Sequence, residues 1–93
     1  MKVIDSKDTD TLMTFPCQFE VKAMGHNDSE LEQIVVGIVR RHLPVDAPYS
    51  VRSHLSRTAR YKSLTISFTA TDRAQLDAMY QDLTDEPIVL VAL

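Results

Sequence analysis

The residues that could carry chemistry are three histidines and one cysteine, spread along the chain. The histidines are His26, His42 and His54, and the cysteine is Cys17. Their separations match neither the short spacings of a zinc site nor a known motif that pairs a nucleophile with its base. A single cysteine also allows no internal disulfide. We therefore predict no metal, no cofactor and no catalytic residue, and expect a protein that is not an enzyme.

One turn of the chain offers a candidate ligand site. It reads Gly25-His26-Asn27-Asp28, between a predicted strand and a predicted helix. Glycine permits a backbone with positive φ, and a helix start presents free N–H groups to a small anionic or zwitterionic ligand. The simpler alternative is that Gly25 only makes a turn and Asn27 only caps the helix.

A second candidate site is a run of positive charge. No acidic residue occurs between Asp46 and Asp72. Four cations stand in that interval: Arg52, Arg57, Arg60 and Lys62. In a chain of net charge −3, such a segment can dock an acidic partner or an anionic ligand, and the alternative is an ordinary solvated surface. The net negative charge argues against a general nucleic-acid binder.

These candidate sites must be positioned by strands and helices that the pattern of apolar residues predicts. Alternation of apolar and polar residues predicts strands at residues 16–24, 49–57 and 61–70, and a short apolar run predicts a last strand at 88–93. The chain between 57 and 61 is too long for a two-residue turn, so we expect a wider hairpin loop there.

Apolar residues at helical spacing predict two helices, at about residues 31–42 and 72–83. Asn27 with Glu30, and Asp72 with Gln75, have the spacing of a capping box at each start. Pro44 and Pro87 follow the two helices and close them.

The resulting order, β-α-β-β-α-β, predicts an α+β, ferredoxin-like fold. It consists of a four-stranded antiparallel sheet with two helices on one face. Ninety-three residues suffice for one domain, which we place at residues 15–93 after a flexible N-terminal segment, residues 1–14.

The last predicted strand is apolar on both sides, and this fold places it at a sheet edge. An exposed apolar edge pairs readily with other chains unless it is covered. We predict that it is covered by the N-terminal segment or by a second copy of the chain, which would make a homodimer. No signal peptide or membrane-spanning run is visible, so we expect a cytoplasmic protein without membrane contact.

The motif F-P-x-x-F-x-x-K-x-M-G at residues 15–25 resembles the opening signature of the YbeD-like family of small, uncharacterised bacterial proteins. R-H-x-P at residues 41–44 continues the resemblance, which covers residues 12–93. One departure is that Ala59 and Arg60 stand where the family usually has a glycine. The resemblance implies a fold akin to ACT domains, which bind amino acids or other small metabolites and regulate enzymes, often as dimers.

Together these observations favour a non-enzymatic regulatory or adaptor module that senses a small metabolite at Gly25–Asp28 in an ACT-like manner. The alternative is a pure protein–protein interaction domain that uses the basic hairpin, residues 52–62.

Overall fold

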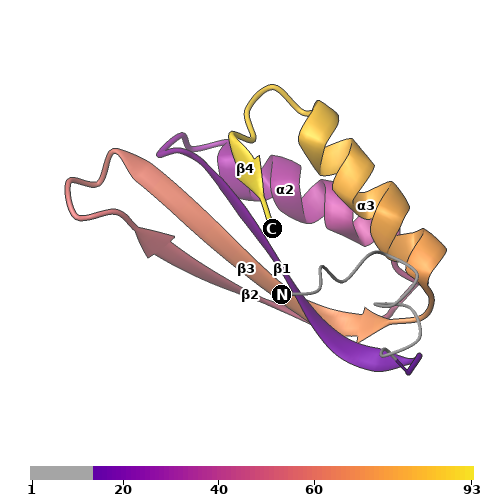
Figure 1. The fold of residues 1–93 in the computed structure, drawn as a ribbon. Coiled ribbons are helices and arrows are strands. Elements are labelled where there is room, and N and C mark those ends of the chain that lie inside the picture. Colours follow the sequence, from indigo (N-terminus) through magenta and orange to yellow (C-terminus); the bar gives the residue numbers. More distant parts are fainter. Residues whose placement is uncertain (1–13) are drawn as a thin grey trace, which may run out of the picture.

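The computed structural model describes residues 14–93, which fold into four strands and two helices (Figure 1). In chain order these are β1 (Cys17–His26), α2 (Leu31–Arg41), β2 (Tyr49–Leu55), β3 (Tyr61–Ala70), α3 (Arg73–Asp85) and β4 (Val91–Ala92). The predicted order of elements is confirmed. The N-terminal segment predicted at residues 1–14 lies, apart from residue 14, outside the described residues.

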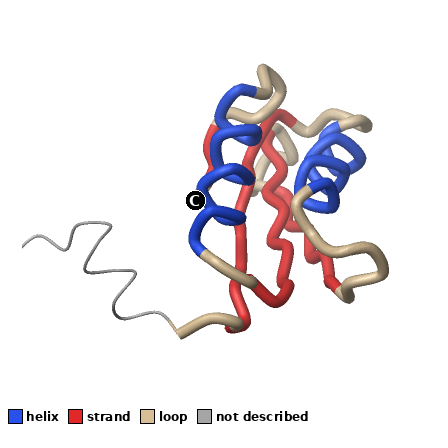
Figure 2. The backbone as a smooth tube through the Cα atoms, turned by 90° about the vertical axis from the view of Figure 1, so that its right-hand side faces the viewer, coloured by secondary structure: helices blue, strands red, loops and turns tan. Residues whose placement is uncertain are grey.

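The four strands form one antiparallel sheet in the spatial order β2-β3-β1-β4. The central strands β1 and β3 pair along their whole length, from Cys17 opposite Ala70 to His26 opposite Tyr61. Both helices lie on one side of the sheet (Figures 1 and 2). The predicted ferredoxin-like fold is therefore confirmed.

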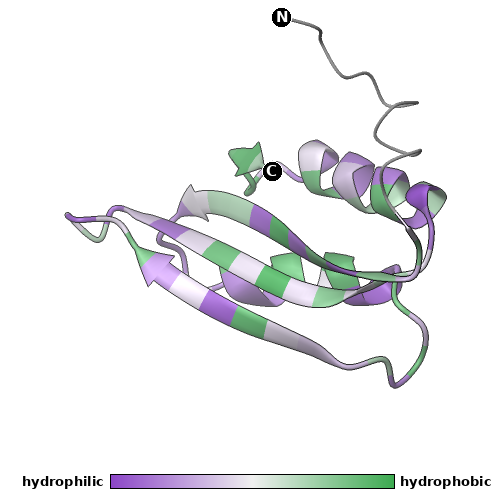
Figure 3. Ribbon diagram, turned by 60° about the horizontal axis from the view of Figure 1, so that its bottom comes forward, coloured by the Kyte–Doolittle hydropathy of each residue, from purple (hydrophilic) through white to green (hydrophobic). Residues whose placement is uncertain are grey.

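The core lies between this sheet and the helices. Val21 of β1 and Leu64 and Ile66 of β3 have no exposed surface, whereas the residues between them face solvent on the open side. Figure 3 shows the resulting alternation of hydropathy along both strands. The helices contribute Leu31, Val35, Ile38, Val39, Leu76, Met79 and Leu83. Each large apolar side chain removed from water stabilises the fold by about 1.5–3 kcal/mol before its entropy cost.

The predicted capping box at the start of α3 is present in part: Asp72 caps the helix, and Gln75 reaches back to the residue before the cap. The carboxylate of Asp72 accepts a hydrogen bond from the backbone N–H of Gln75 at 2.7 Å. The side-chain oxygen of Gln75 in turn accepts from the N–H of Thr71 at 2.9 Å. Backbone donors at this helix start are thus satisfied by side chains.

The capping box predicted at Asn27 and Glu30 is wrong. Helix α2 begins at Leu31, and the preceding Glu30 makes no side-chain cap. The acceptor at this helix start is Asp28, whose Oδ1 accepts from the N–H of Glu30 at 2.8 Å. Asn27 is used elsewhere because its side chain faces the hairpin loop.

The last strand is shorter than predicted, since only Val91–Ala92 pair as a strand, opposite Met24 and Ala23 of β1. Before it, the N–H of Val89 donates to the carbonyl of Glu86 at 3.0 Å, so this part of the chain turns instead of extending.

The side chains of this edge remain uncovered by residues 14–93. Leu90, Val91 and Leu93 are 50, 45 and 70% exposed. The N-terminal segment lies outside the described residues, so its covering role stays a prediction, as does a second copy. Neither helix of residues 14–93 combines the length and hydropathy needed to cross a bilayer.

Candidate functional site

The predicted ligand turn begins inside a strand. Gly25 belongs to β1, pairs with Lys62, and does not have the positive φ that we expected. Glycine is needed here for space: an added Cβ would lie 2.5 Å from the carbonyl oxygen of Ile88 and 2.9 Å from Cδ1 of Leu31. The backbone at Ile88 and the side chain of Leu31 therefore pack directly against Gly25.

The next residues of the turn hold the hairpin loop between β2 and β3. The backbone N–H of Asn27 donates to the carbonyl of Arg60 at 2.9 Å, and its side-chain Nδ2 donates to the carbonyl of Ala59 at 3.0 Å. The ring of His26 stacks on Tyr61, with centroids 5.2 Å apart and planes at 26°. The two candidate sites, separate in the sequence, thus form one unit.

The loop itself is closed by Ser56. Its N–H donates to the carbonyl of Tyr61 at 2.8 Å, its Oγ accepts from the N–H of Tyr61 at 3.0 Å, and its carbonyl accepts from Ala59 at 2.8 Å. Ala59 has φ 59°, the left-handed conformation that favours glycine. The predicted wider loop is confirmed. Its residue 59 adopts a conformation typical of glycine although it is an alanine.

The four cations of the basic hairpin fall into two pairs. Arg52 lies 2.9 Å from Glu20 on the open face of the sheet, and Lys62 lies 3.5 Å from Glu32 of α2. Arg57 and Arg60 are exposed and form no ion pair within residues 14–93. Positive charge that is free of a carboxylate is therefore concentrated at the tip of the hairpin, which projects beyond the helices (Figure 1).

A shallow hollow of about 310 Å³ lies beside the hairpin on the open face of the sheet. Lys22 and His54 line it together with the Arg52–Glu20 pair. The hollow extends the basic surface from the hairpin onto the sheet.

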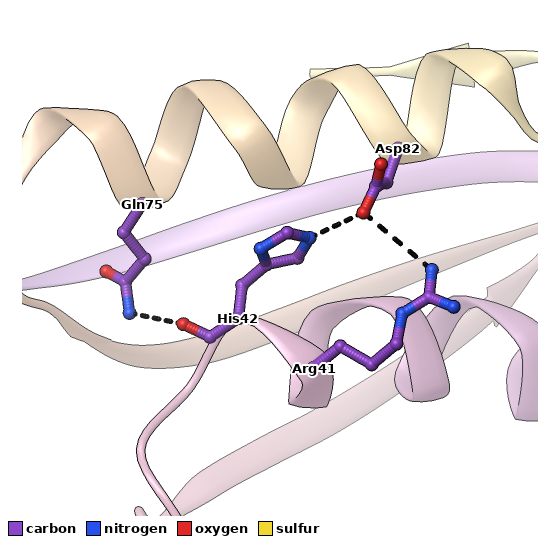
Figure 4. Close-up of polar contacts among 4 residues, drawn as sticks. All are labelled: Arg41, His42, Gln75 and Asp82. Atoms are coloured by element: carbon purple, nitrogen blue, oxygen red, sulfur yellow. Dashed lines mark hydrogen bonds and ion pairs between the residues drawn. The ribbon is translucent and has the colours of Figure 1, made fainter.

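A polar cluster that the sequence did not predict joins the two helices (Figure 4). Nε2 of His42 lies 2.6 Å from Oδ2 of Asp82, and Arg41 approaches the same oxygen at 3.8 Å. The side chain of Gln75 donates to the carbonyl of His42 at 2.8 Å. A histidine beside a carboxylate supplies two of the three members of a catalytic triad, but the other two groups of this cluster are a guanidinium and an amide, which are not nucleophiles.

The remaining candidates have packing environments. Cys17 is half-buried at the edge of the core, where it packs as a small apolar residue. Burial raises the pKa of the Tyr80 hydroxyl above its ordinary value of 10.0. Within residues 14–93, no three histidine, cysteine or acidic side chains converge in a way that could hold a metal ion.

Comparisons with known proteins agree on one family. Residues 10–93 match the family described as "Protein of unknown function (DUF493)". A UPF0250 protein of Nitrosomonas europaea is 41% identical over 86 residues, which cover 90% of this chain and 97% of that one. A UPF0250 protein of Chromobacterium violaceum is 38% identical over 88 residues, covering 95% and 99%.

The fold also matches a solved structure. Protein HP0495 of Helicobacter pylori superposes with a TM-score of 0.66 over 100% of this chain and 98% of that one. The sequence identity is 14%, so this likeness concerns the fold alone.

Proposed function

We propose that this chain, which belongs to the DUF493 family of bacterial proteins of unknown function, is a non-enzymatic adaptor. That family includes the UPF0250 or YbeD-like proteins. The proposal rests on the surface of this chain: its basic hairpin binds an acidic segment of a partner protein. The observation that supports this most directly is the pair Arg57 and Arg60, exposed at the hairpin tip without an ion pair in residues 14–93. Free guanidinium groups favour carboxylates, because each guanidinium can donate two hydrogen bonds to one carboxylate.

The stiffness of the loop supports the same proposal. Hydrogen bonds from Asn27 and Ser56 fix the backbone on both sides of the two arginines. A loop that is ordered before binding loses less conformational entropy when a partner docks. The adjacent hollow with Lys22 and His54 would extend the attraction for an acidic chain.

A metabolite-sensing role at Gly25–Asp28 remains a prediction. Gly25 is enclosed by Ile88 and Leu31, and the polar groups of Asn27 already serve the hairpin. Residues 25–28 could regulate the hairpin, because a ligand that displaced Asn27 would break its hydrogen bonds to the loop between β2 and β3. Amino acids, screened by thermal shift, test that role: a ligand that binds the folded chain raises its melting temperature.

The adaptor proposal places the protein in the cytoplasm and without membrane or nucleic-acid partners. The lone thiol of Cys17 supports the cytoplasmic location, and the net charge of −3 supports the absence of a nucleic-acid partner.

Binding of a labelled hexaglutamate peptide to the full chain tests the adaptor proposal. We expect amide shifts at residues 57–61 that weaken with added salt, because exposed charges are screened. The R57E/R60E variant should lose binding at least tenfold. The matched control is K2E/K7E, which changes the net charge by the same amount outside the described residues. Equal binding by R57E/R60E and by the wild type would contradict the proposal.

A further inference from the structure

The outward face of α2 has an unusual composition. Glu30, just before the helix, and Gln33, Gly37, Arg40 and Arg41 are exposed, and the helical repeat places them in one stripe. Glu32 is also exposed but lies off this stripe and pairs with Lys62. Glycine in a helix interior is unfavourable because it loses more backbone entropy than any other residue. Nothing lies within 4 Å of the point where a Cβ at Gly37 would stand. Packing within the chain therefore gives no reason for a glycine at this position.

Three grooves meet at Gly37. One, of about 670 Å³, lies between α2 and α3, and another, of about 620 Å³, lies between α2 and Lys62 of the basic hairpin. The third, of about 570 Å³, lies between the end of α2 and the loop that follows it. Because Gly37 has no side chain, the surface of α2 between these grooves is low. A second helix could therefore cross α2 at Gly37 with the two backbones in close contact.

The charges of the stripe itself are separated by sign. At one end Glu30 lies with Asp85 of α3 and the following Glu86 around the first groove, which also contains Arg41 and Asp82 at its other end. At the other end stand Arg40 and Arg41, about 15 Å away at 1.5 Å per residue. Arg41 is 65% exposed despite its 3.8 Å approach to Asp82, so its guanidinium can take a second carboxylate.

From this pattern we infer that α2 is the contact surface of a homodimer, in which two copies of the helix pack antiparallel across a two-fold axis at Gly37. In this arrangement the basic end of α2 in each copy faces the acidic end of α2 in the other copy. The two-fold axis therefore repeats this ionic contact twice in the dimer. The two helix dipoles also oppose one another, which is favourable. The inference uses neither Arg57 nor Arg60, so it is independent of the proposed function.

Charge exchange tests the pairing. Sedimentation of the wild type should show a dimer that dissociates on dilution. R40E/R41E makes the stripe wholly acidic, and E30K/Q33K makes it largely basic, so each variant alone should be monomeric. An equimolar mixture of the two should form a heterodimer. A wild type that stays monomeric at about 1 mM, or a mixture that stays monomeric, would overturn the inference; far-ultraviolet circular dichroism verifies that both variants are folded.

Cross-linking tests the geometry. In a Cys17→Ser background, Gly37→Cys should form a disulfide-linked dimer under mild oxidation, because the two-fold axis brings the two sulfurs together. Ala78→Cys, an exposed position on α3, is the control and should remain uncross-linked. A dimer that forms without cross-linking at position 37, for example through the exposed edge of β4, would contradict the α2 interface. Equal cross-linking at both positions would also contradict it.

Discussion

The imidazole of His42 lies 2.6 Å from the carboxylate of Asp82, and this contact connects the end of α2 to the body of α3 (Figure 4). The two residues are 40 positions apart in the chain. Gln75 adds a second contact at the same place by donating to the backbone carbonyl of His42. The last backbone carbonyl groups of a helix have no hydrogen-bond donor within the helix. At the end of α2, side chains of α3 contact the chain and supply one such donor.

A double-mutant cycle should measure this connection. We expect His42→Ala and Asp82→Ala to be coupled by about 1 kcal/mol in the free energy of unfolding, because the histidine side chain is only 20% exposed while Asp82 is partly solvated. Urea denaturation gives the values. The Arg52–Glu20 pair, whose side chains are 67% and 53% exposed, is the control and should be coupled by less than about 0.5 kcal/mol. Equal coupling in both cycles would contradict a structural role for the histidine pair.

The two glycines of the chain should respond oppositely to alanine. Gly25→Ala places a Cβ against the carbonyl of Ile88 and the side chain of Leu31, so we expect a loss of about 1–3 kcal/mol in the free energy of unfolding. Gly37→Ala meets no neighbour and gains helix propensity, so it should stabilise the monomer by about 1 kcal/mol. Thermal or urea unfolding at low protein concentration measures both. A neutral Gly25→Ala would show that β1 and the chain at Ile88 are less closely packed than described.

The hairpin loop should become more stable with glycine at position 59. Ala59 has φ 59°, and a left-handed residue with a Cβ costs about 1–2 kcal/mol. Part of that gain is lost because glycine raises the entropy of the unfolded chain, so Ala59→Gly should stabilise by about 0.5–1 kcal/mol. Ala78→Gly, at an exposed position in the middle of α3, is the control and should destabilise by about 1 kcal/mol. If both variants destabilised equally, the left-handed conformation at residue 59 would be refuted.

Much of the fold was predictable because it depends on local periodicity. Alternation along β1 and β3 identified the buried side of each strand, since a strand with one covered face has a period of two. One error occurred where a distant segment decides the structure. Asn27 has the spacing of a helix cap, but its side chain donates to Ala59, 32 residues away. The error at β4 has a local cause: the strand is limited to Val91–Ala92 because the preceding turn directs Val89 into the core.

The candidate site was predictable only in part. A run without acidic residues identified the basic hairpin, but the sequence did not show which of its charges are paired. Glu20 and Glu32 lie on other elements, and only the register of the sheet and the position of α2 bring them to Arg52 and Lys62. The link between Asn27 and the hairpin depends on the same register. No pattern in the sequence indicates either relationship.

Stability at alkaline pH should depend on Tyr80. Burial raises the pKa of its hydroxyl in the folded chain above the value of 10.0 that applies when it is exposed. Well below pH 10 the hydroxyl is protonated in both states and folding is unaffected. As pH rises from 10 through the raised folded pKa, the unfolded chain releases this proton more readily, so unfolding becomes more favourable. Urea unfolding between pH 8 and pH 11 should therefore show a loss of stability that is smaller in Tyr80→Phe.

The control is Tyr61→Phe, which retains Tyr80 and should show the full loss of stability. Identical pH profiles for the wild type and Tyr80→Phe would exclude the buried hydroxyl as the cause of the loss.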